Sequence, residues 1–347
     1  MHVWTETPVT AIWEQLRYFT AAANVRNLLT GTIKSRRQVL WPAGSDTDAR
    51  ADEIAAAVAQ ADEYFQSARS VGLATRPLLQ FYGAEALAKA TIIAADREAS
   101  LQGLKYHGLG TRASTASLAE RDDLQDYADT PARWTVEDEY AVGNLGVFPN
   151  FARVMGDPEP PSGAVFRFRE VVRILPDLAQ AYERYYGESS HCIRLYELPR
   201  FVSGEAFLIH FTGVELGTLR TVFPEFSVGF EEDTKHEQPG FRSLSTTGQA
   251  PTFGRAIRHS VAGHYFVRPI SSGVSTPVVT LFIASFIASN IVRYKPAFWM
   301  RILEGRSSGS ATMVEMMSNL MDRRFPHDVL ESLWNERFTF GSPGYLA

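Results

Sequence analysis

The sequence predicts a mostly α-helical protein with a small β insertion, an α+β fold built on a helical-bundle core. Apolar residues recur at three- and four-residue steps near the N-terminus, and a long apolar segment precedes Arg293 near the C-terminus. Alternating apolar patterns are confined to short stretches between these regions. We therefore expect residues 1–104 and 276–347 to form the helical core and residues 105–275 to form a mixed insertion.

Two helices are expected near the N-terminus. Thr7 and Pro8 are typical of an N-cap followed by a proline in the first turn, where the missing amide proton costs nothing. One apolar stripe follows as far as Phe19. A second stripe, from Ile54 to Ala68, has the same helical spacing and an acidic polar face, so each helix can bury one side against a core.

A third helix is expected from Pro77 to about Asp96. Its residues are apolar on nearly every side, so it must be almost completely buried. Gly83 in its interior costs about 1 kcal/mol relative to alanine, which is acceptable where a neighbouring helix approaches closely. The link around Gly72 is short, so we expect the second and third helices to pack as an antiparallel pair.

The middle of the chain has a more broken pattern. Glycines and prolines interrupt residues 105–163, which predicts loops and short helices, whereas residues 166–186 have the spacing of one helix. Residues 231–263 are rich in Gly, Ser, Thr and charge and predict a long exposed loop. Three stretches alternate in polarity as strands do: Cys192 to Leu198, Ala206 to Thr212 and His264 to Ile270.

The C-terminal part returns to helical spacing. A helix is expected over residues 277–304, with a kink at Pro296, and shorter helices over residues 310–320 and 325–334. The apolar segment at residues 278–292 is shorter than the roughly 20 residues needed to cross a bilayer. It predicts a buried core helix and no association with a membrane.

Composition narrows the function classes. The net charge of -5 argues against a protein that is basic on all sides, although it allows a local basic patch. Of the 34 Lys and Arg residues only five are lysine, which is more typical of a GC-rich genome than of phosphate recognition, because the arginines are spread along the chain. The single cysteine, Cys192, excludes an intrachain disulfide and a cysteine-cluster zinc site. The N-terminus lacks the pattern of a signal peptide, so we expect a cytoplasmic protein.

Known catalytic and nucleotide-binding motifs are absent from the sequence. It has no P-loop, no Rossmann glycine motif, no nucleophile elbow and no His-Glu-x-x-His helix. The acidic run at residues 231–233 with His236 could bind a hard cation, but such runs are usually solvated, so neither a metal nor a cofactor is predicted. Two Arg–His pairs have the spacing found in helical ribonucleases: Arg184 with His191 and Arg258 with His264. Composition alone explains two such pairs.

Three clusters are candidate sites because of their position. His107 follows the third helix, and Gly108 and Gly110 allow the backbone to expose it or to approach it closely. The alternative is a histidine that hydrogen-bonds a loop. The second cluster is a basic stretch that could hold an anion or nucleic acid, with ordinary surface charge as the alternative: Arg255, Arg258, His259, His264 and Arg268.

The third cluster surrounds Arg293 at the end of the buried C-terminal segment. An arginine in this position needs a carboxylate, a carbonyl or a bound anion as its partner. Glu85 on the third helix is one candidate partner, and such a pair would make the cluster structural. The supporting members are Tyr82, Asn290, Tyr294 and Lys295.

Three segments together resemble the YaaC-like family of bacterial proteins: RPLLQFYG at residues 76–83, HGL at 107–109 and SNIVRYKPAFW at 289–299. This resemblance implies a bacterial cytoplasmic protein and carries no specific activity. The helical pair and the later arginine-bearing helix are also distantly similar to HEPN proteins, a group of helical ribonucleases, RNA-binding proteins and toxin or defence components. Arg293 falls at the position of their catalytic arginine, whereas no histidine follows it within six residues.

Two hypotheses about function follow. In the first, the protein is a non-catalytic binding or regulatory subunit in a bacterial stress or anti-phage defence system, with a protein partner, RNA or DNA. In the alternative, it is a metal-independent HEPN-like ribonuclease in which Arg293 stabilises phosphate charge and His107 transfers the proton. HEPN-like folds commonly pair their helices, so a homo-oligomer is also expected. The ribonuclease hypothesis requires His107 and Arg293 to act on one phosphate.

Overall fold

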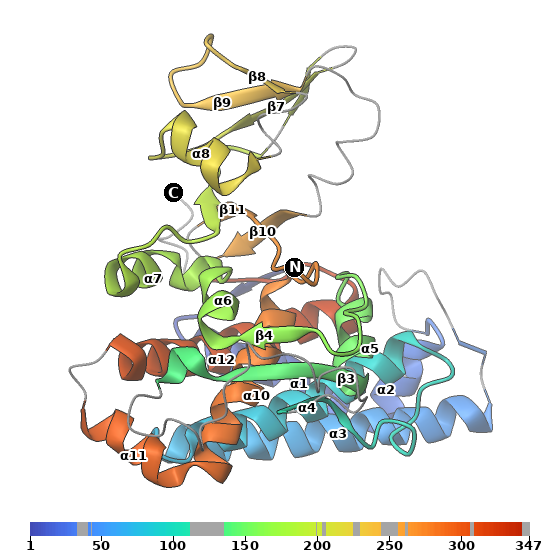
Figure 1. The fold of residues 1–347 in the computed structure, drawn as a ribbon. Coiled ribbons are helices and arrows are strands. Elements are labelled where there is room, and N and C mark those ends of the chain that lie inside the picture. The colour runs from blue at the N-terminus through green and yellow to red at the C-terminus, as the bar shows by residue number, and fades with distance from the viewer. Residues whose placement is uncertain are drawn as a thin grey trace. The chain divides into compact units, whose positions relative to one another are not determined.

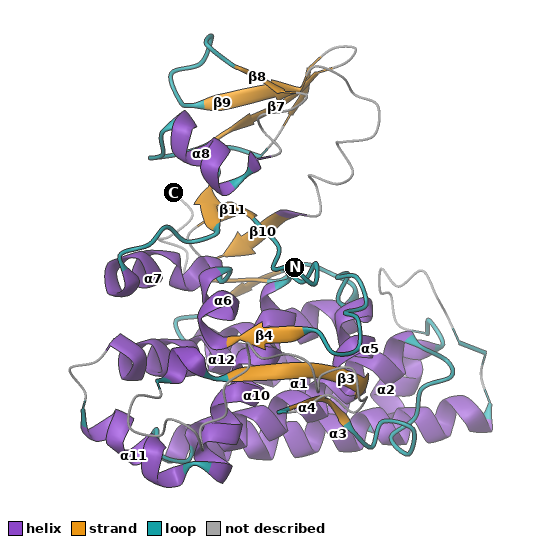
Figure 2. Ribbon diagram, in the orientation of Figure 1, coloured by secondary structure: helices purple, strands orange, loops and turns teal. Residues whose placement is uncertain are grey.

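The computed structural model describes residues 1–32, 41–42, 44–111, 135–198, 200–202, 206–224, 230–243, 256–260, 263–305 and 309–341. The chain divides into two compact units, residues 1–169 with 281–347 and residues 170–280. Helices dominate the described residues and the strands form small sheets, which confirms the predicted mostly α fold (Figure 1, Figure 2).

The first unit is mainly helical (Figure 2). Its helices are α1 (Pro8–Arg17), α2 (Ala22–Leu29), α3 (Ser45–Ser70), α4 (Arg76–Ala95), α5 (Val147–Val154), α10 (Pro277–Tyr294), α11 (Pro296–Glu304) and α12 (Gly309–Trp334). Two short strands near the chain ends, β1 (His2–Trp4) and β12 (Thr339–Gly341), pair in parallel. In the described part of the chain, α10 alone is long and apolar enough to cross a membrane, and 83% of its apolar window is buried, as in the core helix of a soluble protein.

Helices α3 and α4 form the predicted antiparallel pair. The stripe from Ile54 to Ala68 faces the core, and Phe65 in this stripe is fully buried. A Cβ atom on Gly83 of α4 would lie 2.7 Å from Cδ2 of Phe65, so the glycine allows the two helices to approach closely. Arg50, near the start of α3, hydrogen-bonds the carbonyl of Ala99, beyond the end of α4, which fixes the antiparallel direction.

Residues 105–163 contribute two strands of a sheet where loops and short helices are predicted. Strands β2 (His107–Gly110), β3 (Tyr140–Gly146) and β4 (Val165–Arg167) pair antiparallel in that order. The glycines that indicate loops instead allow close contacts between strands. Gly146 has φ +140°, and a Cβ atom there would lie 2.4 Å from the carbonyl oxygen of Tyr106.

The single helix predicted at residues 166–186 is wrong. The chain forms β4, then α6 (Phe168–Arg173), the 3-10 turn η4 (Pro176–Leu178) and α7 (Ala179–Tyr186). Pro176 disfavours the helical conformation in the preceding residue, and Leu175 accordingly has extended angles, with φ -92° and ψ 109°.

Two predicted helix boundaries near the C-terminus are also wrong. Lys295 leaves the helical conformation, with φ -131° and ψ 48°, so residues 277–304 form two helices, and Pro296 begins the second one. Residues 310–334, in contrast, lie in the single helix α12 with Pro326 in its interior. Phe325 and Val329 are fully buried on either side of this proline, so packing offsets the lost backbone hydrogen bond.

The second unit contains two antiparallel sheets. One has the order β10 (Ile257–Ser260), β11 (Gly263–Val267), β5 (Cys192–Arg194), and the other has the order β6 (Arg200–Val202), β7 (Ala206–His210), β9 (Gly240–Ser243), β8 (Phe230–Glu232). The helix α8 (Leu216–Val222) contributes Leu219 and Val222 to the same core as Phe211 and Phe241. The long loop predicted at residues 231–263 is wrong for its described part, because one face of this polar stretch is buried: Phe241 is buried whereas its neighbour Arg242 is exposed.

Candidate functional site

The candidate site lies in the first unit, where α4 contacts α10. The ring of Phe81 on α4 packs against those of Phe282 and Phe286 on α10, with centroids 5.6 and 5.4 Å apart. Three polar residues of the predicted cluster follow these aromatic residues at helical spacing: Glu85 on α4, and Asn290 and Arg293 on α10. Tyr82, also of the cluster, is adjacent to Phe81 on α4.

Arg293 lies between two tyrosine rings. Its guanidinium carbon is 5.3 Å from the ring centre of Tyr82 and 5.1 Å from that of Tyr294, and its Nη1 donates a 3.0 Å hydrogen bond to the Tyr294 hydroxyl. Nε of Arg293 is buried without a hydrogen-bond partner, and so is Nδ2 of Asn290, one turn earlier. Buried donors rarely lack an acceptor, so these two groups favour an acceptor from outside the chain.

Glu85, one candidate partner of Arg293, pairs with other residues instead. Its carboxylate lies 2.8 Å from Nζ of Lys89, one turn later on α4, and 2.9 Å from Nδ1 of His107. The contact with His107 has the distance of an ion pair, although the ring nitrogen is not aligned for a hydrogen bond. Burial alone would raise the pKa of Glu85, but His107 and Lys89 together hold it below its usual value.

The backbone after His107 explains how this histidine reaches Glu85. Gly108 has φ +74°, and a Cβ atom there would lie 2.6 Å from the amide nitrogen of Phe148. The register between β2 and β3 shifts between His107 and Leu109, which is typical of a β-bulge. Gly108 therefore allows the close backbone approach that the sequence predicts. His107 contacts Glu85 on helix α4 rather than a loop.

His107 and Arg293 contact different aromatic residues and do not pair with each other. The ring of His107 is 6.5 Å from that of Phe286 and 5.4 Å from that of Phe81. Arg293 follows Phe286 by two helical turns, about 10 Å along the axis of α10. Within the described chain, the ion pair of His107 is with Glu85 and the hydrogen bond of Arg293 is with its own neighbour, Tyr294.

Lys295 has a structural role at the break between α10 and α11. Its Nζ lies 2.6 Å from Oε1 of the buried Glu139, just before β3. Its backbone amide still donates to Ile291, and its carbonyl accepts from the amide of Trp299 in the next helix. Lys295 therefore joins two helices and a strand, and its charge is already paired.

The described residues of the predicted basic stretch in the second unit do not gather at one site. Arg255 lies outside the described residues. The side chain of Arg258 donates to the carbonyl of Ser275, which fixes a turn. His259 and His264 face each other across the β10–β11 hairpin, with ring centroids 4.9 Å apart.

Arg268 belongs to a different group of residues. It lines a pocket of about 700 Å³ together with Arg173, His191, Glu188 and Glu215. Burial first, and then the charges of Arg173 and Arg268, lower the pKa of His191 to about 4, so this imidazole is neutral at neutral pH. The pocket therefore combines two cations, two acidic residues and a neutral histidine, a mixed lining that does not select one charge.

A family model described as YaaC-like Protein matches residues 17–333 of the chain. The chain belongs to this family. The match confirms the resemblance carried by residues 76–83, 107–109 and 289–299, and it extends over the whole of the second unit. No curated protein and no solved structure matches this YaaC-like chain.

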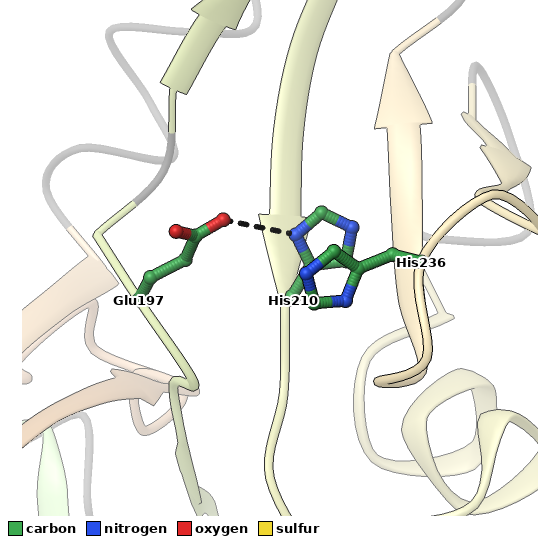
Figure 3. Close-up of side chains that lie close together, drawn as sticks. All are labelled: Glu197, His210 and His236. Carbon is green, nitrogen blue, oxygen red and sulfur yellow. Dashed lines mark ion pairs between the residues drawn. The ribbon is translucent and has the colours of Figure 1, made fainter.

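One cluster of this YaaC-like protein is missed by the sequence prediction. Glu197, His210 and His236 of the second unit come together, with one ligand atom of each within 4.8 Å of the others (Figure 3). Asp233 also contacts His210. Their spacing matches no metal-binding motif, because strand pairing brings them together. The acidic run with His236 is the only part of the cluster that the sequence singles out.

Proposed function

We propose that this YaaC-like protein is a non-catalytic binding protein that recognises single-stranded RNA at Arg293 and Asn290. The observation that carries the proposal is the pair of buried donors, Nε of Arg293 and Nδ2 of Asn290, beside two tyrosine rings. Phosphate oxygens accept hydrogen bonds from such groups, and unpaired bases stack on aromatic side chains. Tyr294 is 65% exposed, so its ring is accessible to a base.

The test measures binding of a fluorescein-labelled oligouridylate by fluorescence anisotropy. Arg293→Ala is expected to weaken binding about tenfold or more, because a hydrogen bond from a charged donor contributes about 1.5–3 kcal/mol. Asn290→Ala is expected to weaken binding roughly threefold to tenfold, as for a neutral donor. Arg293→Lys retains the charge but loses the planar donor, so it should recover only part of the affinity.

The matched control is Arg301→Ala, which removes the same charge from an exposed position on α11. This variant is expected to bind within about twofold of the wild type, since exposed charges contribute little. Equal weakening by Arg293→Ala and Arg301→Ala would reduce the interaction to general electrostatic attraction. Failure of the wild type to bind RNA would remove the proposal and leave a protein partner as the ligand to be sought.

The second candidate is a metal-independent ribonuclease, favoured by the ion pair between His107 and the buried Glu85. A carboxylate within ion-pair distance of an imidazole is a common arrangement for acid–base catalysis. The assay incubates tRNA and mixed RNA with the protein in EDTA, and compares the wild type with Arg293→Ala, His107→Ala and the control His2→Ala, at an exposed histidine. Cleavage that is lost with the first two variants and kept with His2→Ala would establish the enzyme, whereas equal cleavage by all four would indicate a contaminant.

The biological setting we propose is a regulatory subunit of a bacterial stress or anti-phage defence system in the cytoplasm. The resemblance of the helical pair to HEPN proteins supports this setting, and it also supports self-association through the helices. Plating efficiency of phages on a host that carries the gene with its neighbours, compared with the same host carrying Arg293→Ala, tests the defence role. Light scattering of the purified protein tests for a homo-oligomer.

A further inference from the structure

The cluster around His210 in the second unit has the arrangement of a metal-binding site. His210 is the last residue of β7 and is 1% exposed. Glu197 follows β5, and His236 lies in the connection between β8 and β9, so the three residues come from three separate segments (Figure 3). A Cβ atom on Gly240 of β9 would lie 2.3 Å from Cδ2 of His210, which means that the backbone of β9 holds the imidazole in place.

Asp233 determines which nitrogen of His210 carries the proton. Nε2 of His210 lies 2.9 Å from Oδ2 of Asp233, and the other carboxylate oxygen accepts a 3.1 Å hydrogen bond from the amide of Lys235. Asp233 is therefore a carboxylate that accepts the Nε2 proton of His210. In the neutral form of the imidazole, this contact leaves the lone pair on Nδ1, as in metal-binding histidines whose other nitrogen donates to a carboxylate.

The distance on the opposite side of the ring supports a shared ion. Nδ1 of His210 lies 3.5 Å from Oε1 of Glu197. A charged hydrogen bond between these groups would be about 2.7–2.9 Å long. Two ligands of one tetrahedral zinc ion, each bound at about 2.0–2.1 Å, are in contrast about 3.4 Å apart. The spacing suits an ion between the two atoms better than a proton.

His236 supplies the third ligand, and its ring must move for an ion to bind. Its ring is stacked on that of His210, with centroids 4.1 Å apart and an interplanar angle of 26°. An ion binds in the plane of an imidazole ring, so binding requires the His236 ring to turn out of this stack. Its Nδ1 accepts a hydrogen bond from the amide of Gln238 in the same connection, and Tyr196 packs against its edge. These contacts involve one turn and one side chain, so the rotation does not disturb the sheet.

We propose that Glu197, His210 and His236 bind one divalent transition-metal ion of the zinc class, with Asp233 orienting His210. Two imidazoles and a carboxylate form a donor set that suits zinc and leaves a fourth position for water. The predicted absence of a metal rested on motif spacing, and strand pairing produces this cluster without a motif. The cluster therefore assigns a cofactor-binding role to the second unit that the RNA proposal for the first unit does not require.

The test titrates zinc(II), and separately cobalt(II), into the untagged full-length protein after removal of metals with EDTA, with calorimetric detection. The wild type is expected to bind one equivalent. Glu197→Gln and His236→Gln should each weaken binding at least about tenfold, and Asp233→Asn about 10–100-fold. His259→Gln is the matched control, because His259 and His264 form a second histidine pair in the same unit. Its affinity should equal that of the wild type.

A second measurement identifies the ligand atoms. In long-range nitrogen–proton spectra of protein labelled at histidine, the metal should shift Nδ1 of His210 while Nε2 keeps its proton. Circular dichroism confirms that the Glu197→Gln and His236→Gln variants are folded. The proposal is overturned if the wild type binds neither ion, if both of these variants bind as the wild type does, or if His259→Gln is the variant that loses binding.

Discussion

Gly83 provides a quantitative test of the helix pair that carries Tyr82 and Glu85. Replacing it with alanine adds a single Cβ atom, which would lie 2.7 and 2.8 Å from Cδ2 and Cε2 of Phe65 and 3.2 Å from Cβ of Tyr64. Phe65 is completely buried, so its ring cannot move into solvent. One of the two helices must shift instead.

Two opposing terms determine the expected magnitude. Alanine is favoured over glycine by about 1 kcal/mol inside a helix. Overpacking a tight core costs about 1–3 kcal/mol, and the contacts below 3 Å place Gly83→Ala in the upper half of that range. We therefore expect a net loss of about 1–2 kcal/mol in the free energy of unfolding.

The assay uses urea unfolding followed by tryptophan fluorescence. All six tryptophans lie in residues 1–169 and 281–347, so the signal reports on the first unit alone. The substitution Phe65→Leu gives the added methyl group more room, so the double variant should recover at least about 0.5 kcal/mol of coupling energy. Gly72→Ala, in the link between α3 and α4, is the control, because it lies in the same unit and a Cβ atom there meets nothing within 4 Å. Stabilisation by Gly83→Ala, with no coupling to Phe65, would refute the close packing of α3 on α4.

Two further predictions concern carboxylates of the first unit that are buried or partly buried. Burial opposes ionisation of Asp62, but its hydrogen bonds from Arg17, 2.7 and 3.0 Å long, lower its pKa overall. Asp62→Asn should lower the free energy of unfolding by about 1 kcal/mol near neutral pH, a modest value because Arg17 is 43% exposed. This difference is present above the pKa of the unfolded chain, about 3.9, and should disappear as the pH falls through the lower pKa of the folded protein. Burial instead raises the pKa of Asp322, so its ionised form destabilises the fold above the unfolded pKa. Asp322→Asn keeps the oxygen that accepts from Gln80 and should stabilise by on the order of 1 kcal/mol near neutral pH, with no gain in acid. Urea unfolding across pH measures both differences, and a difference that is constant with pH would contradict either assignment.

Local periodicity predicts the elements whose partners are adjacent in sequence. The stripe from Ile54 to Ala68 and the proline at the start of α4 define both helices of the antiparallel pair. Glycine is unfavourable inside a helix, so Gly83 predicts that another helix approaches closely at that point, and the structure confirms it. These features depend on spacing within one helix and on one short link, and both are visible in the sequence.

Distant packing decides the elements that the sequence does not predict. Pro176 and Pro326 both follow a buried apolar residue, yet Leu175 is extended and Phe325 continues a helix. Proline disfavours a helix in each case, and only the surrounding core determines whether that preference is overcome. The polar residues of β8 and β9 likewise predict a loop. Only two residues, Phe230 and Phe241, indicate the buried face of these strands.

The sequence indicates which residues belong to the candidate site but not which of them contact one another. Arg293, Asn290, Glu85 and His107 were all named from sequence, whereas the partner of Glu85 depends on a β-bulge after His107 that no local pattern specifies. Charge alone suggested a pair between Glu85 and Arg293. Because Lys89 and His107 satisfy Glu85 instead, the donors of Arg293 remain for a ligand.

The two proposed sites can be separated experimentally because each consists of residues from one compact unit. EDTA removes a metal from Glu197 and His236 without changing the donors of Arg293. If RNA binding by the wild type is the same in EDTA and in zinc, the first unit recognises RNA independently of the metal. If RNA binding requires zinc and is lost in Glu197→Gln, recognition does not belong to Arg293 and Asn290 alone, and the proposal must be revised to include the second unit.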